Sequence, residues 1–257
     1  MSVLSALPER YRLILCDLWG CVHDGYRLLP GAVERLGQWR EEGRVVLFVT
    51  NAPRSAATVR RQLGSLGLPD TLYRGVVTAG EVGLAALLGR PVGFCGTLDD
   101  RADLEAGGLR VAKGSFIELA CAGLDRGEKV ADYQDRLRGW RSRDVLLHCL
   151  NPDRVVIHGP ERMVCAGALA DAYEALGGRV CWYGKPFETT YVHALELADN
   201  PPKDAVLAIG DGWHTDMAGA ARLGIDAVFV EGGIHAGEPA PAFDNGWRPL
   251  AVVPLLA

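Results

Sequence analysis

Short apolar segments that end in polar motifs limit most strongly what this chain can fold into. The first two are RLILCDL at residues 12–18 and VVLFV at residues 45–49. Runs this short that are apolar throughout are typical of strands buried inside a parallel sheet. Helical spacing follows each run, at residues 32–42 and 55–66, and ends at Gly43 and Gly67. This alternation predicts a right-handed parallel α/β sheet.

The same alternation returns near the end of the chain. Residues 205–209 are apolar, Gly210 and Asp211 interrupt them, a helix is expected from Asp216, and residues 227–230 form another apolar run. Between the two ends lie further strand-like and helical segments, at residues 92–95, 128–140, 145–150 and 166–176. We therefore expect a core formed by residues 1–73 and 183–257, with residues 74–182 as an inserted α/β domain.

Composition excludes several classes of protein. The formal net charge of −5 would repel a polyanion, so nucleic acid is not an expected partner. The densest apolar stretches, at residues 45–49 and 250–257, are far shorter than the roughly 20 residues of a membrane span. The start of the chain, MSVLSALPERYR, lacks the pattern of a secretory signal, which favours the cytoplasm. The 7 cysteines include no C-x-x-C pair and are expected to be buried thiols rather than disulfides or zinc ligands.

Polar side chains follow the expected strands at their carboxyl ends, where open parallel sheets bind ligands. They are Asp17, Thr50, Asn51, Lys185, Asp211 and Asp216. A carboxylate inside the apolar run around Asp17 needs a cation or hydrogen-bond donors to offset its desolvation. Each of the three aspartates could instead serve as a turn or helix-capping residue. Taken together, the carboxylates favour Mg²⁺, with Lys185 as compensating charge and Thr50 as a donor to a phosphoryl oxygen.

Four motifs in a fixed order resemble those of the haloacid dehalogenase superfamily, in its phosphatase branch. They are DLWG-CVHDG, VTN, GKP and GDGWHTD. The further segments PGAVE, VTNAPR, LNPD at residues 150–153 and GKPFE resemble the class IIA, NagD-like members. This resemblance implies a Rossmann-like core with a C2-type α/β cap inserted between the second and third motifs.

The resemblance also implies a role for each matching residue. Asp17 would attack phosphorus and form an aspartyl-phosphate, and Lys185 would orient it. Thr50 and Asn51 would bind the phosphoryl group, and the resemblance implies that Gly20 is a further substrate contact. Mg²⁺ would be ligated by Asp17, the backbone carbonyl of Trp19 and Asp211, with Asp216 as a further ligand or a support for one. In the cap, Asn151 and Asp153 are candidate contacts to a small phosphorylated metabolite, although Asn-Pro-Asp is also ordinary turn chemistry. Cap surfaces in the related class imply a possible homodimer.

One position departs from the family's pattern. The phosphatases carry a second aspartate two residues after the nucleophile, where this chain has Trp19. Indole can neither protonate a leaving alcohol nor activate water. His23, Asp24 or His214 could take over that role, or the substrate could have a leaving group that needs no acid. Two other readings stay open: a catalytically weak protein that binds a phosphorylated ligand, and a hydrolase that displaces halide, since dehalogenases of the superfamily also lack the second aspartate.

Overall fold

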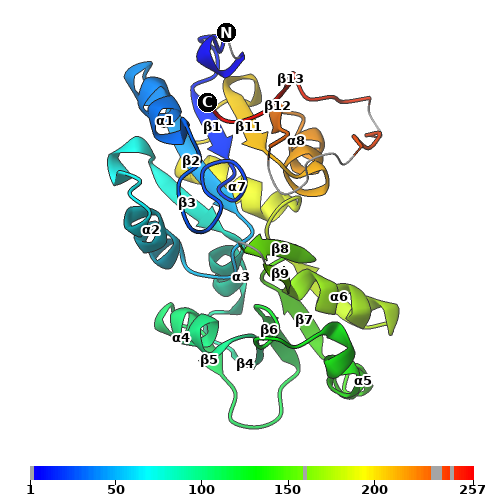
Figure 1. Cartoon of the computed structure of the whole chain (residues 1–257). Coiled ribbons are helices and arrows are strands. Elements are labelled where there is room, and N and C mark those ends of the chain that lie inside the picture. The colour runs from blue at the N-terminus through cyan, green and yellow to red at the C-terminus, as the bar shows by residue number, and fades with distance from the viewer. Residues whose placement is uncertain (1–2, 159–160, 233–238, 244–245) are drawn as a thin grey trace. The chain divides into compact units, whose positions relative to one another are not determined.

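Figure 1 shows the computed structural model, which describes residues 3–158, 161–232, 239–243 and 246–257. The chain divides into two compact units. The first comprises Met1–Thr50, Arg60–Val77 and Lys185–Ala257, and the second comprises Asn51–Val59 and Thr78–Gly184. None of the described helices combines the length and the apolar character needed to cross a bilayer.

The first unit is built on a six-stranded sheet of order β13-β12-β11-β1-β2-β3. Its strands are β1 (Leu13–Cys16), β2 (Val45–Thr50), β3 (Gly75–Thr78), β11 (Val206–Gly210), β12 (Asp226–Val230) and β13 (Ala251–Val253). β1 lies between β2 and β11 and pairs in parallel with both, and each of its residues is buried. Both ends of the chain therefore contribute to one parallel sheet, which confirms the predicted parallel α/β fold. The helices of this part of the chain are α1 (Ala32–Glu41), α7 (Glu188–Leu197) and α8 (Ala218–Leu223). Helix α2 (Ala56–Ser65) begins within the second unit and continues into the first.

The second unit has a parallel sheet of its own, of order β10-β7-β6-β4-β5. The strands are β4 (Pro91–Cys95), β5 (Arg110–Val111), β6 (Glu118–Cys121), β7 (Leu146–Cys149) and β10 (Arg179–Trp182). Its helices are α3 (Ala79–Leu87), α4 (Leu98–Ala106), α5 (Gln134–Ser142) and α6 (Ala166–Ala175), and an antiparallel hairpin joins β8 (Val155–His158) to β9 (Glu161–Val164). Tyr133, Leu137 and Tyr173 pack in its core. An inserted α/β domain is thus present.

Some local expectations differ from the structure. The helix expected over residues 128–140 is a 3₁₀ turn, Val130–Tyr133, followed by α5. The helix expected from Asp216 starts earlier, as a π-helical turn at Trp213–Met217 that leads into α8. β3 belongs to the first sheet. The proposed division into domains, at residues 73 and 183, stays a prediction.

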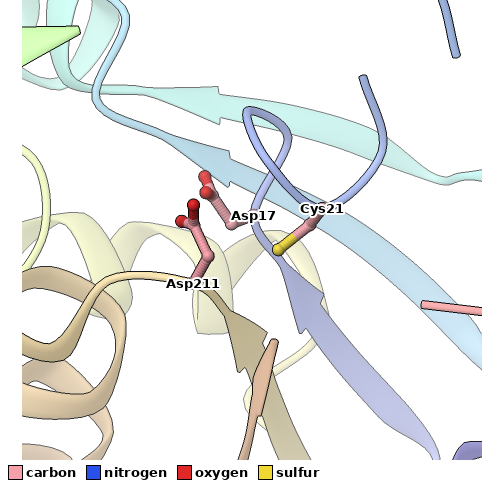
Figure 2. Close-up of side chains that lie close together, drawn as sticks. All are labelled: Asp17, Cys21 and Asp211. Atoms are coloured by element: carbon pink, nitrogen blue, oxygen red, sulfur yellow. The ribbon is translucent and has the colours of Figure 1, made fainter. Parts of the chain in front are cut away.

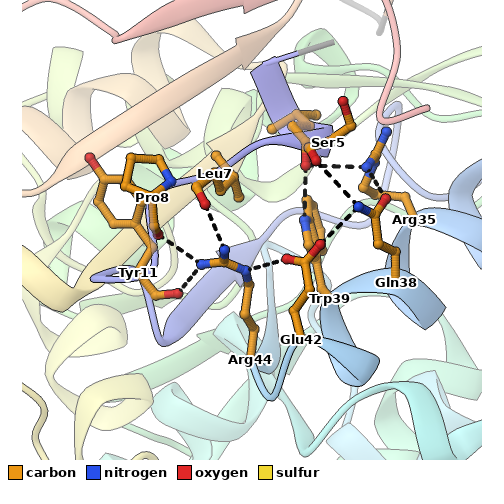
Figure 3. A network of polar contacts seen from close by, with 10 residues as sticks. Ser5, Leu7, Pro8, Tyr11, Arg35, Gln38, Trp39, Glu42 and Arg44 are labelled. Carbon is orange, nitrogen blue, oxygen red and sulfur yellow. Dashed lines mark hydrogen bonds and ion pairs between the residues drawn. The ribbon is translucent and has the colours of Figure 1, made fainter. Parts of the chain in front are cut away.

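Arg35 in the first turn of α1 and Arg44, between α1 and β2, hold the N-terminal segment in place (Figure 3). The Arg44 guanidinium donates to the carbonyl of Leu7 at 2.7 Å, to that of Pro8 at 3.0 Å and to that of Tyr11, and it pairs with Glu42 at 2.8 Å. Only 7% of the Arg44 side chain is exposed. Because backbone carbonyls of the N-terminal segment take up its donors, this charged group can be buried there without an unsatisfied polar atom.

Candidate active site

Asp17 and Asp211 lie at the carboxyl ends of neighbouring strands. β1 ends at Cys16 and β11 at Gly210, and Cys16 is opposite Ile209 in the parallel register. The backbone N–H of Asp17 donates to the carbonyl of Ile209 at 2.8 Å, which continues the ladder one residue beyond β1. Both aspartates are buried. The parallel pairing therefore brings two carboxylates to one edge of the sheet, where the sequence predicted them.

Lys185 lies between Asp17 and a third carboxylate. Its Nζ donates to Asp17 Oδ1 at 2.5 Å and to Asp216 Oδ1 at 2.8 Å. Burial alone would lower the pKa of Lys185, but the charges of Asp17 and Asp216 outweigh it and hold the pKa well above its usual value. Lys185 therefore stays protonated at neutral pH. This side chain is the positive group that the sequence led us to expect beside Asp17.

The turn after β11 is shaped around the Asp216 carboxylate. Gly212 N–H and the Thr215 hydroxyl each donate to Asp216 Oδ2 at 3.2 Å. The side chain lies so close to Gly210 that a Cβ there would overlap its carboxylate. Burial raises the pKa of Asp216 to about 6, since desolvation outweighs the opposing charge of Lys185. π-Helical turns such as this one are often found at functional sites.

The donor set around Asp17 suits a hard divalent cation. One oxygen each of Asp17 and Asp211, together with the Cys21 sulfur, lie within 4.8 Å of one another (Figure 2). Asp17, Asp211 and Asp216 bring three negative charges to this cluster, against one positive charge from Lys185. A divalent cation would balance the remainder, and buried carboxylate oxygens are the ligands that Mg²⁺ prefers. The residues present therefore fit such an ion.

Thr50 and Asn51 follow one another at the end of β2 but belong to different units. Thr50 is the last residue of β2, on the opposite side of β1 from β11, and is buried. Asn51 is buried in the second unit, where its Nδ2 donates to Asp153 Oδ1 at 2.8 Å. Asn151 Oδ1 accepts the backbone N–H of Asp153 at 3.1 Å. The structure thus brings three predicted substrate contacts, Asn51, Asn151 and Asp153, together within one unit.

Trp19 and Gly20 form a tight loop with His23. Gly20 has a φ of 79°, which favours glycine, and its N–H donates to the His23 carbonyl at 2.9 Å. That donor is therefore engaged inside the loop rather than offered to a substrate. The indole of Trp19 meets the His23 ring edge to face at 5.1 Å between centroids. The roles predicted for Gly20 in substrate binding and for the Trp19 carbonyl in metal binding stay predictions.

The groups that could replace the missing acid are poorly suited to it. Burial lowers the pKa of His23 to about 4, and its Nδ1 accepts the N–H of Gly25 at 3.0 Å. The ring is therefore neutral at pH 7 and has no free lone pair on that nitrogen. Backbone hydrogen bonds from Tyr26 and Arg27 hold the pKa of Asp24 below its usual value. His214 is exposed.

Two residues near this cluster did not stand out in the sequence. Cys21 was expected only as a small buried hydrophobe, yet its sulfur points toward Asp17 and Asp211 (Figure 2). Its position four residues after Asp17, in the same loop, was the available signal. The hydroxyl of Tyr191, in α7, donates to the Asp216 carbonyl at 3.5 Å. The Tyr191 side chain lies so close to Gly219 that a Cβ at that position would overlap it. No motif indicated that contact.

Comparisons with known proteins agree on one family. Residues 14–110 match the model described as haloacid dehalogenase-like hydrolase, and residues 182–257 match one described as HAD-hydrolase-like. A solved haloacid dehalogenase-like hydrolase from Brucella suis is 35% identical, with a TM-score of 0.89 over 99% of this chain and 98% of that one.

Two further relatives carry more specific names. The solved glycerol phosphate phosphatase from Mycobacterium tuberculosis, in complex with calcium, is 25% identical, with a TM-score of 0.76 over 100% of this chain and 74% of that one. Bovine chronophin is 28% identical over 94% of this chain and 88% of its own length. With its split parallel core and its inserted α/β unit, the chain belongs to the haloacid dehalogenase-like hydrolases, in their class IIA, NagD-like branch.

Proposed function

We propose that this chain is a Mg²⁺-dependent phosphatase that acts on a small phosphorylated metabolite through an aspartyl-phosphate at Asp17. The observation that carries the proposal is the contact of Lys185 Nζ with Asp17 Oδ1 at 2.5 Å, beside Asp211 at the next strand end. The arrangement leaves a buried, oriented carboxylate in a site with unbalanced negative charge. The similarity to a protein named as a glycerol phosphate phosphatase supports the hydrolysis of a phosphate ester.

The first step would be attack by a carboxylate oxygen of Asp17 on the phosphorus atom. A bond forms between that oxygen and phosphorus, and the ester bond to the leaving oxygen breaks with its electron pair going to that oxygen. Water then attacks the phosphorus of the aspartyl-phosphate, which releases inorganic phosphate and restores Asp17. Neither step requires an oxidant or a reductant.

Positive charge and hydrogen-bond donors would favour this transfer by electrostatics. Lys185 holds Asp17 in one orientation and offsets charge on the transferring group. Thr50, at the end of β2, offers a hydroxyl, and Asn51 offers an amide to the phosphoryl oxygens. Asp17 and Asp211, with the Trp19 carbonyl, would hold Mg²⁺, and Asp216 would hold Lys185 in place or serve as a further ligand. When bound, the ion would neutralise charge on the phosphoryl oxygens.

Trp19 restricts which substrates such an enzyme can use well. General acid-base help is typically worth about 10²- to 10⁴-fold in rate, and indole supplies none. His23 is neutral and Asp24 is held as a carboxylate, so neither donates a proton to the leaving group at neutral pH. We therefore propose a substrate whose leaving group departs without a proton from the protein. Asn151 and Asp153 would contact the remainder of that substrate.

The test is hydrolysis of 4-nitrophenyl phosphate with Mg²⁺ by the wild type and by Asp17→Asn. The variant should lose roughly 10³-fold or more of kcat, because the amide is not a nucleophile toward phosphorus. Asp24→Asn serves as the matched control, since that carboxylate lies seven residues along the same loop and is partly exposed. EDTA should remove activity and Mg²⁺ should restore it.

The same assay separates the alternatives. Undiminished turnover by Asp17→Asn would refute the mechanism. Binding of inorganic phosphate without any turnover by the wild type would favour a protein that only binds a phosphorylated ligand. Release of halide from a 2-haloacid in the presence of EDTA would favour the dehalogenase, whose chemistry needs no metal.

A further inference from the structure

The segment that follows β2 is anchored to helix α4. Asp103 of α4 accepts the backbone N–H of Ser55 at 2.6 Å, the Ser55 hydroxyl at 2.8 Å, and the hydroxyl of Thr58. Ser55 and Asp103 are 48 residues apart in sequence and belong to the same unit. One carboxylate therefore fixes both the backbone and the side chains at the start of α2.

A second acid on the same helix strengthens this anchor. Asp100 Oδ1 pairs with Arg54 Nε at 3.0 Å, and its Oδ2 accepts the Thr97 hydroxyl at 2.6 Å. Residues three apart on a helix share a face, so Asp100 and Asp103 present their carboxylates on the same side of α4. The Asp100 side chain is only 8% exposed, which strengthens its pairing with Arg54.

The beginning of the segment is fixed as well. The carbonyl of Ala52 accepts the N–H of Gly80 at 3.0 Å, and a Cβ at Gly80 would overlap the backbone of Pro53. Asn51 is held by Asp153 at 2.8 Å. Residues 51–58 are thus tied to the second unit along their whole length, although they continue directly from Thr50 at the end of a core strand.

We propose that Asp103, supported by Asp100, is a positioning residue for phosphoryl binding by Thr50 and Asn51. The inference rests on the proposed function, which gives those two residues that task. Donors bind a phosphoryl group best when they are already fixed in the bound geometry, because ordering them during binding costs free energy. A carboxylate that accepts several hydrogen bonds provides such fixation at the far end of a short loop.

The helix cap at Ser55 allows this role to be separated from a general structural one. Ser55 Oγ accepts the N–H of Thr58 at 3.2 Å, as a helix-capping residue does, and this bond does not involve Asp103. Replacing Asp103 should therefore loosen the loop while α2 keeps its cap. A role confined to stability would lower the melting temperature and leave phosphate affinity unchanged.

The experiment compares the full-length wild type with Asp103→Asn, which offers one acceptor oxygen in place of two. Amide hydrogen exchange should accelerate in residues 51–58 and not in β1 or β11. The inhibition constant of inorganic phosphate, measured with 4-nitrophenyl phosphate as substrate, should rise about tenfold, as expected for losing charge-assisted hydrogen bonds. Asp103→Glu, which keeps the charge, should recover part of that affinity.

Asp99→Asn is the matched control, because Asp99 lies on the same helix with its side chain 81% exposed. Unchanged exchange in Asp103→Asn would overturn the anchor. Faster exchange with unchanged phosphate inhibition would overturn the positioning role while the proposed function stands. If the wild type neither hydrolyses the ester nor binds phosphate, the proposed function fails and the positioning role fails with it, while the exchange data still report separately on the anchor.

Discussion

Lys185 Nζ lies 2.5 Å from Asp17 Oδ1, and both side chains are more than nine-tenths buried. The same ammonium also reaches Asp216 at 2.8 Å. Coulomb attraction between such groups is strong only because water is excluded, and the same exclusion makes each charge costly when its partner is removed. The stability of the fold therefore depends on this contact, and in the proposed mechanism turnover depends on it as well.

Lys185→Met should abolish turnover and destabilise the fold. The substitution preserves much of the side chain's volume but leaves Asp17 and Asp216 as buried carboxylates without their common cation. Removing one member of a buried pair costs about 3–5 kcal/mol of unfolding free energy. Urea unfolding with EDTA present measures this cost, and the exposed Lys113→Met is the control. An unfolding free energy equal to that of the wild type would contradict the role of the pair.

Asp216 should make the metal-free protein less stable as pH rises. Burial raises its folded pKa to about 6, above the ordinary aspartate value of 3.8. The folded state then holds the proton to higher pH than the unfolded state, so the stability that this group contributes is full below 3.8 and is lost as pH rises through about 6. Asp216→Asn lacks this titration. We expect the unfolding free energy of the wild type to fall relative to that of the variant between about pH 4 and pH 7. Unfolding measured in EDTA over this pH range tests this, and parallel curves of unfolding free energy against pH would refute the raised pKa of Asp216.

The sequence could predict the centre of the site because parallel strands align their carboxyl ends. Asp17 and Asp211 each come at the end of an apolar run. If both runs are strands of one parallel sheet, the two aspartates lie close together as soon as the two strands are neighbours. The need for a cation beside Asp17 followed from desolvation alone, and Lys185 meets it.

Other contacts depend on where distant segments pack, which periodicity does not report. Helical spacing was expected from residue 55, yet nothing in the sequence indicated that Asp103, 48 residues away, would accept the N–H of Ser55. The early π-helical start at Trp213 also escaped prediction, because apolar spacing does not report the close approach of Asp216 to Gly210 within this turn.

Trp19→Asp should widen the range of substrates. A carboxylic acid at this position could protonate a leaving alkoxide, so hydrolysis of glycerol phosphate should rise by roughly 10²-fold. Hydrolysis of 4-nitrophenyl phosphate should change much less, because nitrophenolate departs without protonation. Trp19→Asn removes the indole equally and supplies no acid, which makes it the control. An equal rise in the rate of glycerol phosphate hydrolysis in both variants would mean that the indole only blocks the substrate sterically.

His23→Asn should leave the pH profile of kcat/KM unchanged between about pH 6 and pH 8. The wild-type ring has a pKa of about 4 because it is buried, so it does not titrate in that range. The asparagine Oδ1 can replace Nδ1 as the acceptor for the N–H of Gly25, which keeps the loop in place. Loss of an ionisation from the profile of the variant would instead identify His23 as the replacement acid or base.

Arg44→Met should lower stability without affecting the chemistry. The guanidinium donates to carbonyls of Leu7, Pro8 and Tyr11 in the N-terminal segment, and its loss leaves those acceptors without their partner. Several such bonds to one charged, buried group are together worth about 2–4 kcal/mol of unfolding free energy. The exposed Arg40→Met, at the end of the preceding helix α1, is the control. The KM for 4-nitrophenyl phosphate should stay the same in both variants, since Arg44 lies at the opposite end of β2 from Thr50. A large rise in KM for Arg44→Met alone would show that the N-terminal segment also supports the site.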